Sequence, residues 1–168
     1  MGSQLKGVVI RALTAADEPF LWEMLYQAIY VPKGQAPPPQ EIVYQPELAY
    51  YVQNWGREGD CGYLAIDVDG QSVGAIWLRL AQESCHGYGY VDDDTPELSM
   101  ALLPDFRSKG IGTQLFNDLF TSPCIHPKIS LSVSAKNPAR RLYERVGFET
   151  IEQDGESLTM IRVEKENG

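Results

Sequence analysis

The chain has 168 residues, of which 43% are hydrophobic and 22% are charged, a composition close to that of an ordinary globular protein. This length predicts a single domain over residues 1–168, and the composition excludes a disordered, collagen-like or repeat-built chain. Fourteen Lys and Arg against 23 Asp and Glu give a net charge of −9 at pH 7, which opposes a broad nucleic-acid-binding surface because phosphate backbones are negative.

The first elements in chain order are a strand over 7–13 and an amphipathic helix that runs to about residue 30. Thr14 and Asp17 form a capping box at the start of this helix. Prolines and a glycine in 31–45 predict a long loop, which is unusual in a compact domain and is therefore a candidate binding element. A short second helix is expected over 46–56, with a proline in its first turn.

The rest of the chain alternates between strands and helices. The pair Asp69-Gly70 between two apolar runs predicts a β-hairpin of strands 62–68 and 72–80, and the polar residues 83–94 predict a loop. The elements that follow are a strand over 98–103, a helix over 111–120, a strand over 129–133, a helix over 138–146, and strands over 148–153 and 157–163. This order, β-α-α-β-β-β-α-β-α-β-β, predicts an α+β fold in which helices flank a mixed sheet.

The three cysteines, Cys61, Cys85 and Cys124, are odd in number, widely spaced and without a C-x-x-C pair. We therefore expect reduced thiols in a cytoplasmic chain. The pairs Cys85-His86 and Cys124-x-His126 are too tightly spaced for a usual zinc site, so no metal is expected. The sequence has no apolar run of about 18 residues and no signal-peptide pattern at its N-terminus, so we expect no membrane partner.

The most informative segment connects the strand that ends at Pro104 to the helix that begins at Ile111, and reads Arg107-Ser-Lys-Gly110-Ile-Gly112. Amide groups at a helix start lack partners and carry the positive end of the helix dipole. Glycines leave room for an anion, and Arg107 and Lys109 add positive charge, so this turn is a candidate phosphate site. The third glycine of a dinucleotide fingerprint and the lysine of a Walker A loop are absent. The simpler alternative is that Gly110 and Gly112 only permit a tight turn.

A second motif, Asn137-Pro-Ala-Arg-Arg-Leu-Tyr143 followed by Gly147-Phe148, runs from a capping Asn through a short helix into a strand. With Arg107-x-x-Gly110-x-Gly112 about thirty residues before it, the chain resembles the GNAT superfamily of acetyl-CoA-dependent N-acetyltransferases. The signatures of that family are R/Q-x-x-G-x-G/A and N-x-x-A-x-x-L-Y-x-x-x-G-F. This chain departs from them at Ala139, one position early, and at Ser108, where the family often has Gly.

The resemblance covers about 97–149 by motif and nearly the whole chain by element order. It implies a mostly antiparallel mixed sheet of about seven strands flanked by about four helices, splayed between the fourth and fifth strands. The resemblance also implies a site for coenzyme A. Main-chain groups of the splayed strand would pair with pantetheine, and the amides of the turn would hold the pyrophosphate. These residues are Met100, Ala101 and Leu102 on the strand, and Arg107, Ser108, Lys109, Gly110, Ile111, Gly112 and Thr113 in the turn.

Two further residues take roles from the resemblance. Asn137 would contact the pantetheine arm or another part of coenzyme A. Tyr143 would donate its phenolic proton to the departing thiolate, since a phenol stays protonated at neutral pH. The alternative for Tyr143 is apolar packing of its helix.

The amine nucleophile must lose a proton, and Glu97 at the start of the splayed strand is our candidate general base. Ser99 would lie on the same face by the two-residue period of a strand. Glu97 could instead orient a cationic substrate or form a surface ion pair, and the carboxylates of Asp92–Asp94 are another source of a base, although such runs are more often solvated.

The resemblance implies direct transfer of an acetyl group from acetyl-CoA to a primary amine of a small molecule, peptide or protein. No cysteine stands in either motif, which disfavours a covalent relay. The alternatives are an enzyme of the same class that uses another acyl donor, and a catalytically weak sensor of acyl-CoA. Residues 107–145 carry +5 and the rest of the chain −14, so a basic cofactor region lies in an acidic body that would attract cationic acceptors. Selectivity is expected from the first two helices and from the loops 31–45 and 83–94, and homodimerisation is a family analogy.

Overall fold

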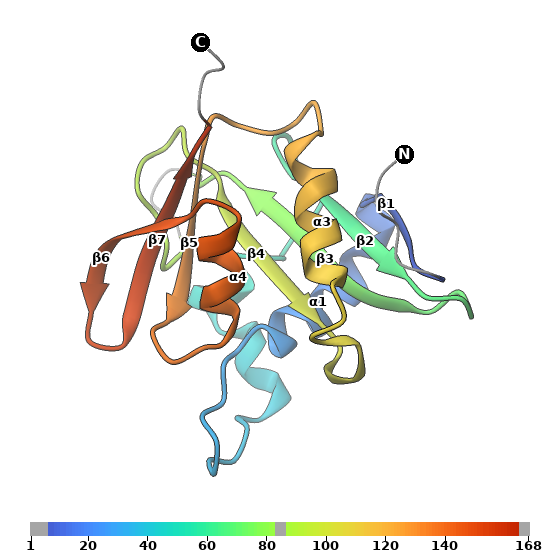
Figure 1. Cartoon of the computed structure of the whole chain (residues 1–168), viewed down its shortest axis with the longest axis horizontal. Coiled ribbons are helices and arrows are strands. Elements are labelled where there is room, and N and C mark those ends of the chain that lie inside the picture. The colour runs from blue at the N-terminus through green and yellow to red at the C-terminus, as the bar shows by residue number, and fades with distance from the viewer. Residues whose placement is uncertain (1–6, 83–86, 165–168) are drawn as a thin grey trace.

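The computed structural model describes residues 7–82 and 87–164, and it contains a seven-stranded sheet with the order β1-β2-β3-β4-β5-β7-β6 (Figure 1). The strands are β1 (Val9–Ala12), β2 (Cys61–Ile66), β3 (Ser72–Arg79), β4 (Glu97–Leu102), β5 (Lys128–Ser134), β6 (Glu149–Asp154) and β7 (Ser157–Val163). Neighbouring strands are antiparallel except β4 and β5, which are parallel. The predicted α+β class and the mixed, mostly antiparallel sheet are therefore confirmed.

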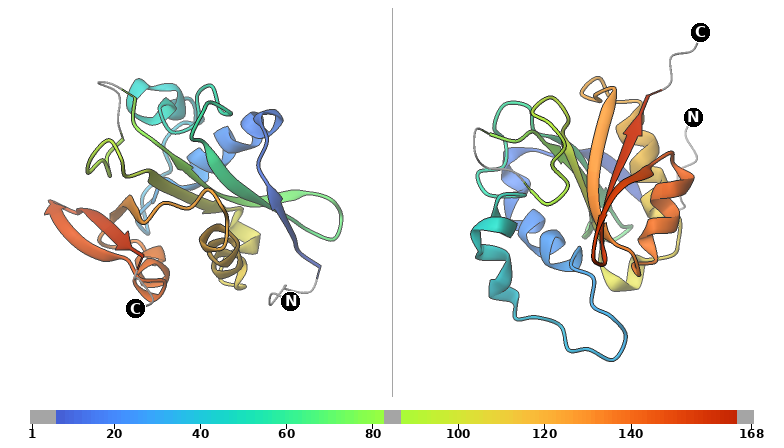
Figure 2. Two further views of the ribbon diagram at one scale, coloured as in Figure 1. Left: turned by 90° about the horizontal axis from the view of Figure 1, so that it is seen from above. Right: turned by 90° about the vertical axis from the view of Figure 1, so that its left-hand side faces the viewer.

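Helices cover both faces of the sheet. They are α1 (Glu18–Gln27), α2 (Pro46–Ala49), α3 (Ile111–Phe120) and α4 (Ala139–Arg145), with short 3₁₀ turns at Ala15–Asp17, Gln40–Tyr44 and Pro104–Phe106. The right-hand view of Figure 2 shows α1 and α2 on one face and α3 and α4 on the other. Each face has its own apolar core: Leu21 and Met24 of α1 pack with Trp77, whereas Leu115 and Phe116 of α3 pack with Ile76.

The splay between the fourth and fifth strands is present. β4 pairs with β3 at six positions from Glu97 to Leu102, but with β5 only at Glu97, opposite Ser130. Beyond that pair the two strands diverge, as Figure 1 shows toward the arrowhead of β4. The edge of β4 that faces β5 is therefore outside the ladder from Leu98 to Leu102.

The second helix is shorter than expected, because α2 ends at Ala49 and the chain continues to Gly56 as turns. Asn54 and Gly56 have left-handed backbones, with φ of 63° and 107°. The carbonyls of Tyr50 and Gln53 accept hydrogen bonds from the guanidinium of Arg79. A buried side chain of the sheet thus takes carbonyls that a longer helix would use, which helical spacing could not reveal.

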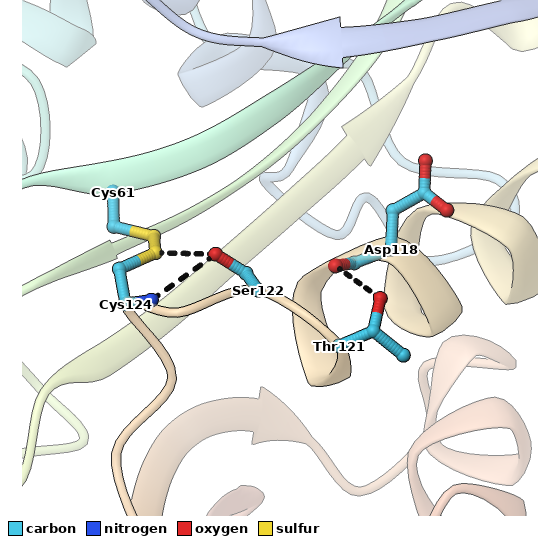
Figure 3. Close-up of a disulfide and its surroundings, with 5 residues drawn as sticks. All are labelled: Cys61, Asp118, Thr121, Ser122 and Cys124. Carbon is cyan, nitrogen blue, oxygen red and sulfur yellow. Dashed lines mark hydrogen bonds between the residues drawn. A yellow bond between two sulfur atoms is a disulfide. The ribbon is translucent and has the colours of Figure 1, made fainter.

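The expectation of reduced thiols is wrong for Cys61 and Cys124, which form a disulfide across 63 residues of sequence (Figure 3). Their Cα atoms are 6.4 Å apart, within the usual range for a bridge. The bridge ties the start of β2 to the segment after α3, where Ser122 Oγ lies 2.9 Å from Cys124 Sγ. Cys85 lies outside the described residues. Among those that are described, no helix is both long and apolar enough to cross a membrane.

Candidate active site

A cavity of about 410 Å³ opens where β4 and β5 diverge. Four of the predicted site residues line it together: Glu97 and Met100 from β4, Asn137 from the turn before α4, and Tyr143 from α4. Glu97 contacts the core on the α1 side of the sheet, whereas Tyr143 belongs to the core on the α3 side. The gap between the strands lets groups from opposite faces share one cavity. Ser99 lines it too.

Glu97 is 5% exposed and lies deep in this cavity. Its Oε2 atom accepts hydrogen bonds from the hydroxyl of Tyr51, at 2.5 Å, and from the backbone N–H of Gly89, at 3.0 Å. The Tyr51 hydroxyl in turn accepts a bond from the backbone N–H of Tyr88, at 2.7 Å. Glu97 is thus a buried carboxylate in a hydrogen-bonded network, and its burial argues against the alternative of an exposed surface pair.

Tyr143 packs its ring in the core on the α3 side of the sheet and also lines the cavity. Its ring makes edge contacts with Phe116 and Phe148, with centroids 6.0 Å and 6.1 Å apart. Burial raises the pKa of this phenol to about 12. Within the described part of the chain, no group forms a hydrogen bond with the hydroxyl. The packing role is therefore present, and it leaves the hydroxyl available to a ligand.

Asn137 has a structural role as well as a place in the cavity. Its Oδ1 atom accepts a hydrogen bond from the backbone N–H of Ala139, at 2.9 Å, and so caps the start of α4. Because that oxygen is engaged, the NH₂ group is the part of the side chain that a ligand would meet.

The predicted phosphate turn leads directly into α3, and backbone conformation and packing explain its glycines. Gly110 has a left-handed backbone with φ of 87°, and so does Ser108, with φ of 60°. A Cβ at Gly112 would lie 3.0 Å from Leu142 Cδ2 and 3.5 Å from Met100 Cε, so a side chain there would crowd Leu142. Both glycines therefore satisfy the simpler alternative of a tight turn. Through Met100, the turn also lies next to the cavity.

The cationic side chains of this turn have partners within the protein. Arg107 donates hydrogen bonds to the carbonyl of Leu102, at 3.2 Å, and to Gln27, at 3.1 Å to its Oε1 atom. This guanidinium ties the end of β4 to the end of α1, which leaves the backbone N–H groups as the anion donors. Lys109 Nζ lies 5.8 Å from the centroid of the Phe106 ring. Arg107 thus has partners within the protein, and its positive charge beside the anion site stays a prediction.

Sequence reasoning missed the partners of Glu97. Tyr51 lies in the segment predicted as the second helix, and Gly89 lies in the predicted loop 83–94. The contact of Glu97 with Tyr51 spans 46 residues of sequence, and the contact with Gly89 depends on how that loop folds back, so no local pattern indicates either one. Among residues 7–82 and 87–164, no group of three or more His, Cys, Asp or Glu side chains is arranged to hold a metal ion.

Comparison with known proteins agrees with this geometry. The model of the acetyltransferase (GNAT) family matches residues 22–148. No curated protein matches the chain. Similar solved structures include the PaiA N-acetyltransferase of Thermoplasma acidophilum in complex with coenzyme A, which is 20% identical with a TM-score of 0.62 over 93% of this chain and 98% of that one.

Two further structures are similar. A chimera of the Vibrio cholerae spermidine N-acetyltransferase SpeG and hSSAT is 20% identical, with a TM-score of 0.56 over 94% of this chain and 96% of that one. AAC(6')-Ib in complex with ribostamycin and coenzyme A is 24% identical, with a TM-score of 0.57 over 94% of each chain. At these identities the structures show a shared fold, and the family model matches most of the chain. The protein therefore belongs to the GNAT family of acetyltransferases.

Proposed function

We propose that this protein transfers an acetyl group from acetyl-CoA to a primary amine of a small molecule or peptide, by direct attack of the amine. The observation that carries the proposal is the cavity between β4 and β5. It is lined by a buried carboxylate, Glu97, and by the phenol of Tyr143, whose hydroxyl forms no hydrogen bond with a described residue. One group accepts a proton and the other donates one, which is what aminolysis of a thioester requires.

The residues of the chain fit an acyl-coenzyme A. The edge of β4 from Leu98 to Leu102 is outside the ladder with β5, so its main-chain groups suit the amides of a pantetheine arm. The first turn of α3 offers the backbone N–H groups of Ile111, Gly112 and Thr113 to a phosphate, and the helix dipole favours an anion there. Met100 contacts both the cavity and this turn, which supports one continuous binding path.

The two catalytic residues have complementary roles. Glu97 accepts the proton that the attacking nitrogen releases, directly or through water, as the new N–C bond forms. Tyr143 donates its proton to the thiolate as the C–S bond breaks. The raised pKa of Tyr143 keeps it protonated at neutral pH, and the same apolar surroundings raise the pKa of a thiol leaving group, so the donor and the acceptor stay matched.

The acceptor is proposed to be an amine that is protonated, and therefore cationic, when it binds. The cavity walls bring Glu97 and Glu156 together with the rings of Tyr30, Tyr51 and Tyr88, and both kinds of group attract ammonium ions. The similar structures include a spermidine N-acetyltransferase and a complex with ribostamycin, which supports small-molecule amines as the first compounds to examine.

The test combines binding and turnover. Acetyl-CoA should raise the melting temperature, and thiol release should appear with at least one member of a panel of polyamines, aminoglycosides, amino acids and N-terminal peptides. The Glu97→Gln variant should keep the stabilisation and lose most of the turnover. Stabilisation without turnover on any amine would indicate a sensor of acyl-CoA, and no stabilisation by any acyl-CoA would refute both functions.

A further inference from the structure

We propose that Tyr51 is a positioning residue for Glu97: its hydroxyl, together with the segment Gly87–Gly89, fixes the direction and the negative charge of the carboxylate within the cavity. The importance of this role for catalysis rests on the proposed function, in which Glu97 is the base. The contact itself is independent of that function and can be tested without turnover.

The direction of the Tyr51 hydroxyl is determined by its two neighbours. The backbone N–H of Tyr88 can only donate, and it donates to the Tyr51 oxygen at 2.7 Å. The single hydroxyl proton of Tyr51 is therefore directed to Glu97 Oε2, at 2.5 Å. A second donor, the N–H of Gly89, reaches the same oxygen at 3.0 Å. Both bonds favour the ionised form of the carboxylate and hold it in one orientation.

The backbone of Gly87 and Gly89 lies against this pair, and neither position has room for a side chain. A Cβ at Gly87 would collide with the Tyr51 hydroxyl and with the Glu97 carboxylate. A Cβ at Gly89 would lie 2.9 Å from Glu97 Oε2 and 2.7 Å from the backbone carbon of Leu131. The chain thus brings bare backbone up to the carboxylate, which explains why Glu97 is only 5% exposed.

The segment that carries Tyr51 is itself held by the sheet. Arg79 lies opposite Glu97 in the β3–β4 register, and its Nη1 atom donates to the carbonyls of Tyr50, at 2.9 Å, and Gln53, at 2.7 Å. Trp77 Nε1 donates to the carbonyl of Tyr51 itself, at 2.9 Å. Three hydrogen bonds from β3 therefore fix the backbone around Tyr51, as expected for a preorganised site.

The electrostatic surroundings agree with a proton that stays on Tyr51. Burial, and then the charge of Glu97, raise the pKa of Tyr51 well above its usual range, so Tyr51 remains a donor at any working pH. The described charged and titratable groups around this pair are Tyr50 and Arg57, Arg79 on β3 with its ion-pair partner Asp60, and the cavity-lining Tyr30, Tyr88, Tyr143 and Glu156. Arg79 is bound to Asp60 at 2.8 Å, so its charge is largely compensated.

The test is a titration of Glu97 in the whole protein by ¹³C NMR of labelled glutamate carboxylates, with Glu97→Gln to assign the signal. Loss of one donor to the ionised form should raise the pKa of Glu97 by about one to two units in Tyr51→Phe, because a hydrogen bond to a charged group contributes about 1.5 to 3 kcal/mol and one pKa unit corresponds to about 1.4 kcal/mol. Tyr50→Phe is the matched control, since Tyr50 makes an edge contact with the Tyr51 ring at 5.3 Å but lies outside the Glu97 hydrogen bonds. It should leave the Glu97 titration unchanged.

The kinetic counterpart uses the best amine acceptor. The acidic limb of the kcat–pH profile should move upward in Tyr51→Phe by the same amount as the titration, with an unchanged KM for acetyl-CoA. An unchanged Glu97 titration in folded Tyr51→Phe would refute the proposal. If the wild-type protein turns over no amine, the proposed function fails while the titration still decides the role of Tyr51. If Tyr51→Phe does not fold, 3-fluorotyrosine placed at position 51 is a stronger donor and should lower the pKa of Glu97; no change there would also refute the proposal.

Discussion

Replacing Tyr143 with Phe separates its two roles, because the ring packs and the hydroxyl does not. The contacts of the ring with Phe116 and Phe148, at 6.0 Å and 6.1 Å between centroids, need no oxygen. No described residue forms a hydrogen bond with the hydroxyl, so its removal leaves no buried partner unsatisfied. We therefore expect the free energy of unfolding to change by less than about 0.5 kcal/mol.

The expected effect on catalysis is much larger. A general acid contributes about 10²- to 10⁴-fold to a rate, which corresponds to about 3 to 5 kcal/mol of transition-state stabilisation. Tyr143→Phe should therefore lower kcat by at least about 100-fold while the KM for acetyl-CoA stays within about twofold. Because burial raises the pKa of Tyr143 to about 12, deprotonation of this phenol should produce no basic limb in the wild-type kcat profile below about pH 10.

The assay is thiol release with the best amine acceptor, alongside urea denaturation of both proteins. Tyr143→Leu serves as the comparison, since it removes the ring and should cost about 3 kcal/mol of stability. A Tyr143→Phe protein with unchanged kcat would leave packing as the only role of this residue. A large loss of stability in the same variant would contradict the reading that the hydroxyl has no structural partner.

Three further perturbations test other parts of the structure. Gly112→Glu places a carboxylate against Leu142 at the start of α3, where the proposed phosphate site lies. The affinity for coenzyme A, measured by calorimetry, should fall at least about tenfold, and retained affinity would contradict the phosphate site. Arg79→Met removes the 2.8 Å ion pair of buried Asp60 and leaves it with the longer Arg57 contact of 3.9 Å, so it should cost about 3 kcal/mol in urea denaturation. Lys136→Met, at an exposed pair, should cost less than about 1 kcal/mol, and equal costs would refute the argument. The disulfide closes a loop of 63 residues, so a reductant should lower the free energy of unfolding by about 2 to 4 kcal/mol. Thiol titration of the denatured, unreduced protein should find one free thiol among the three cysteines; three free thiols would show that the bridge is absent.

Local patterns predicted the secondary structure well. The hairpin at Asp69-Gly70, the helix from Ile111 and the final strands all lie within a few residues of their expected positions. Turn chemistry and apolar periodicity involve neighbouring residues, so these patterns can be recognised in the sequence without knowledge of the fold. The helix over 46–56 is the exception, because Arg79 on a distant strand binds the carbonyls that would have extended it.

The candidate site was predictable only in part. The motif around Gly110 and Gly112 and the motif from Asn137 to Tyr143 each lie in one short stretch, and their resemblance to a family indicated an acyl-CoA site. The contact of the Arg107 side chain with Gln27 was not predicted, because Gln27 lies 80 residues away in sequence. The contact between Glu97 and Tyr51 was missed for the same reason, because 46 residues separate them.

The sequence by itself determined the elements, the family resemblance and the uneven distribution of charge, since each depends on residues close together in the chain. The tertiary structure decided the rest. The divergence of β4 from β5 brings Glu97 and Tyr143 from opposite faces of the sheet into one cavity, and the register of β3 against β4 sets Arg79 and Trp77 where they hold the segment of Tyr51. These contacts depend on strand pairing and packing over long separations, which no local pattern encodes.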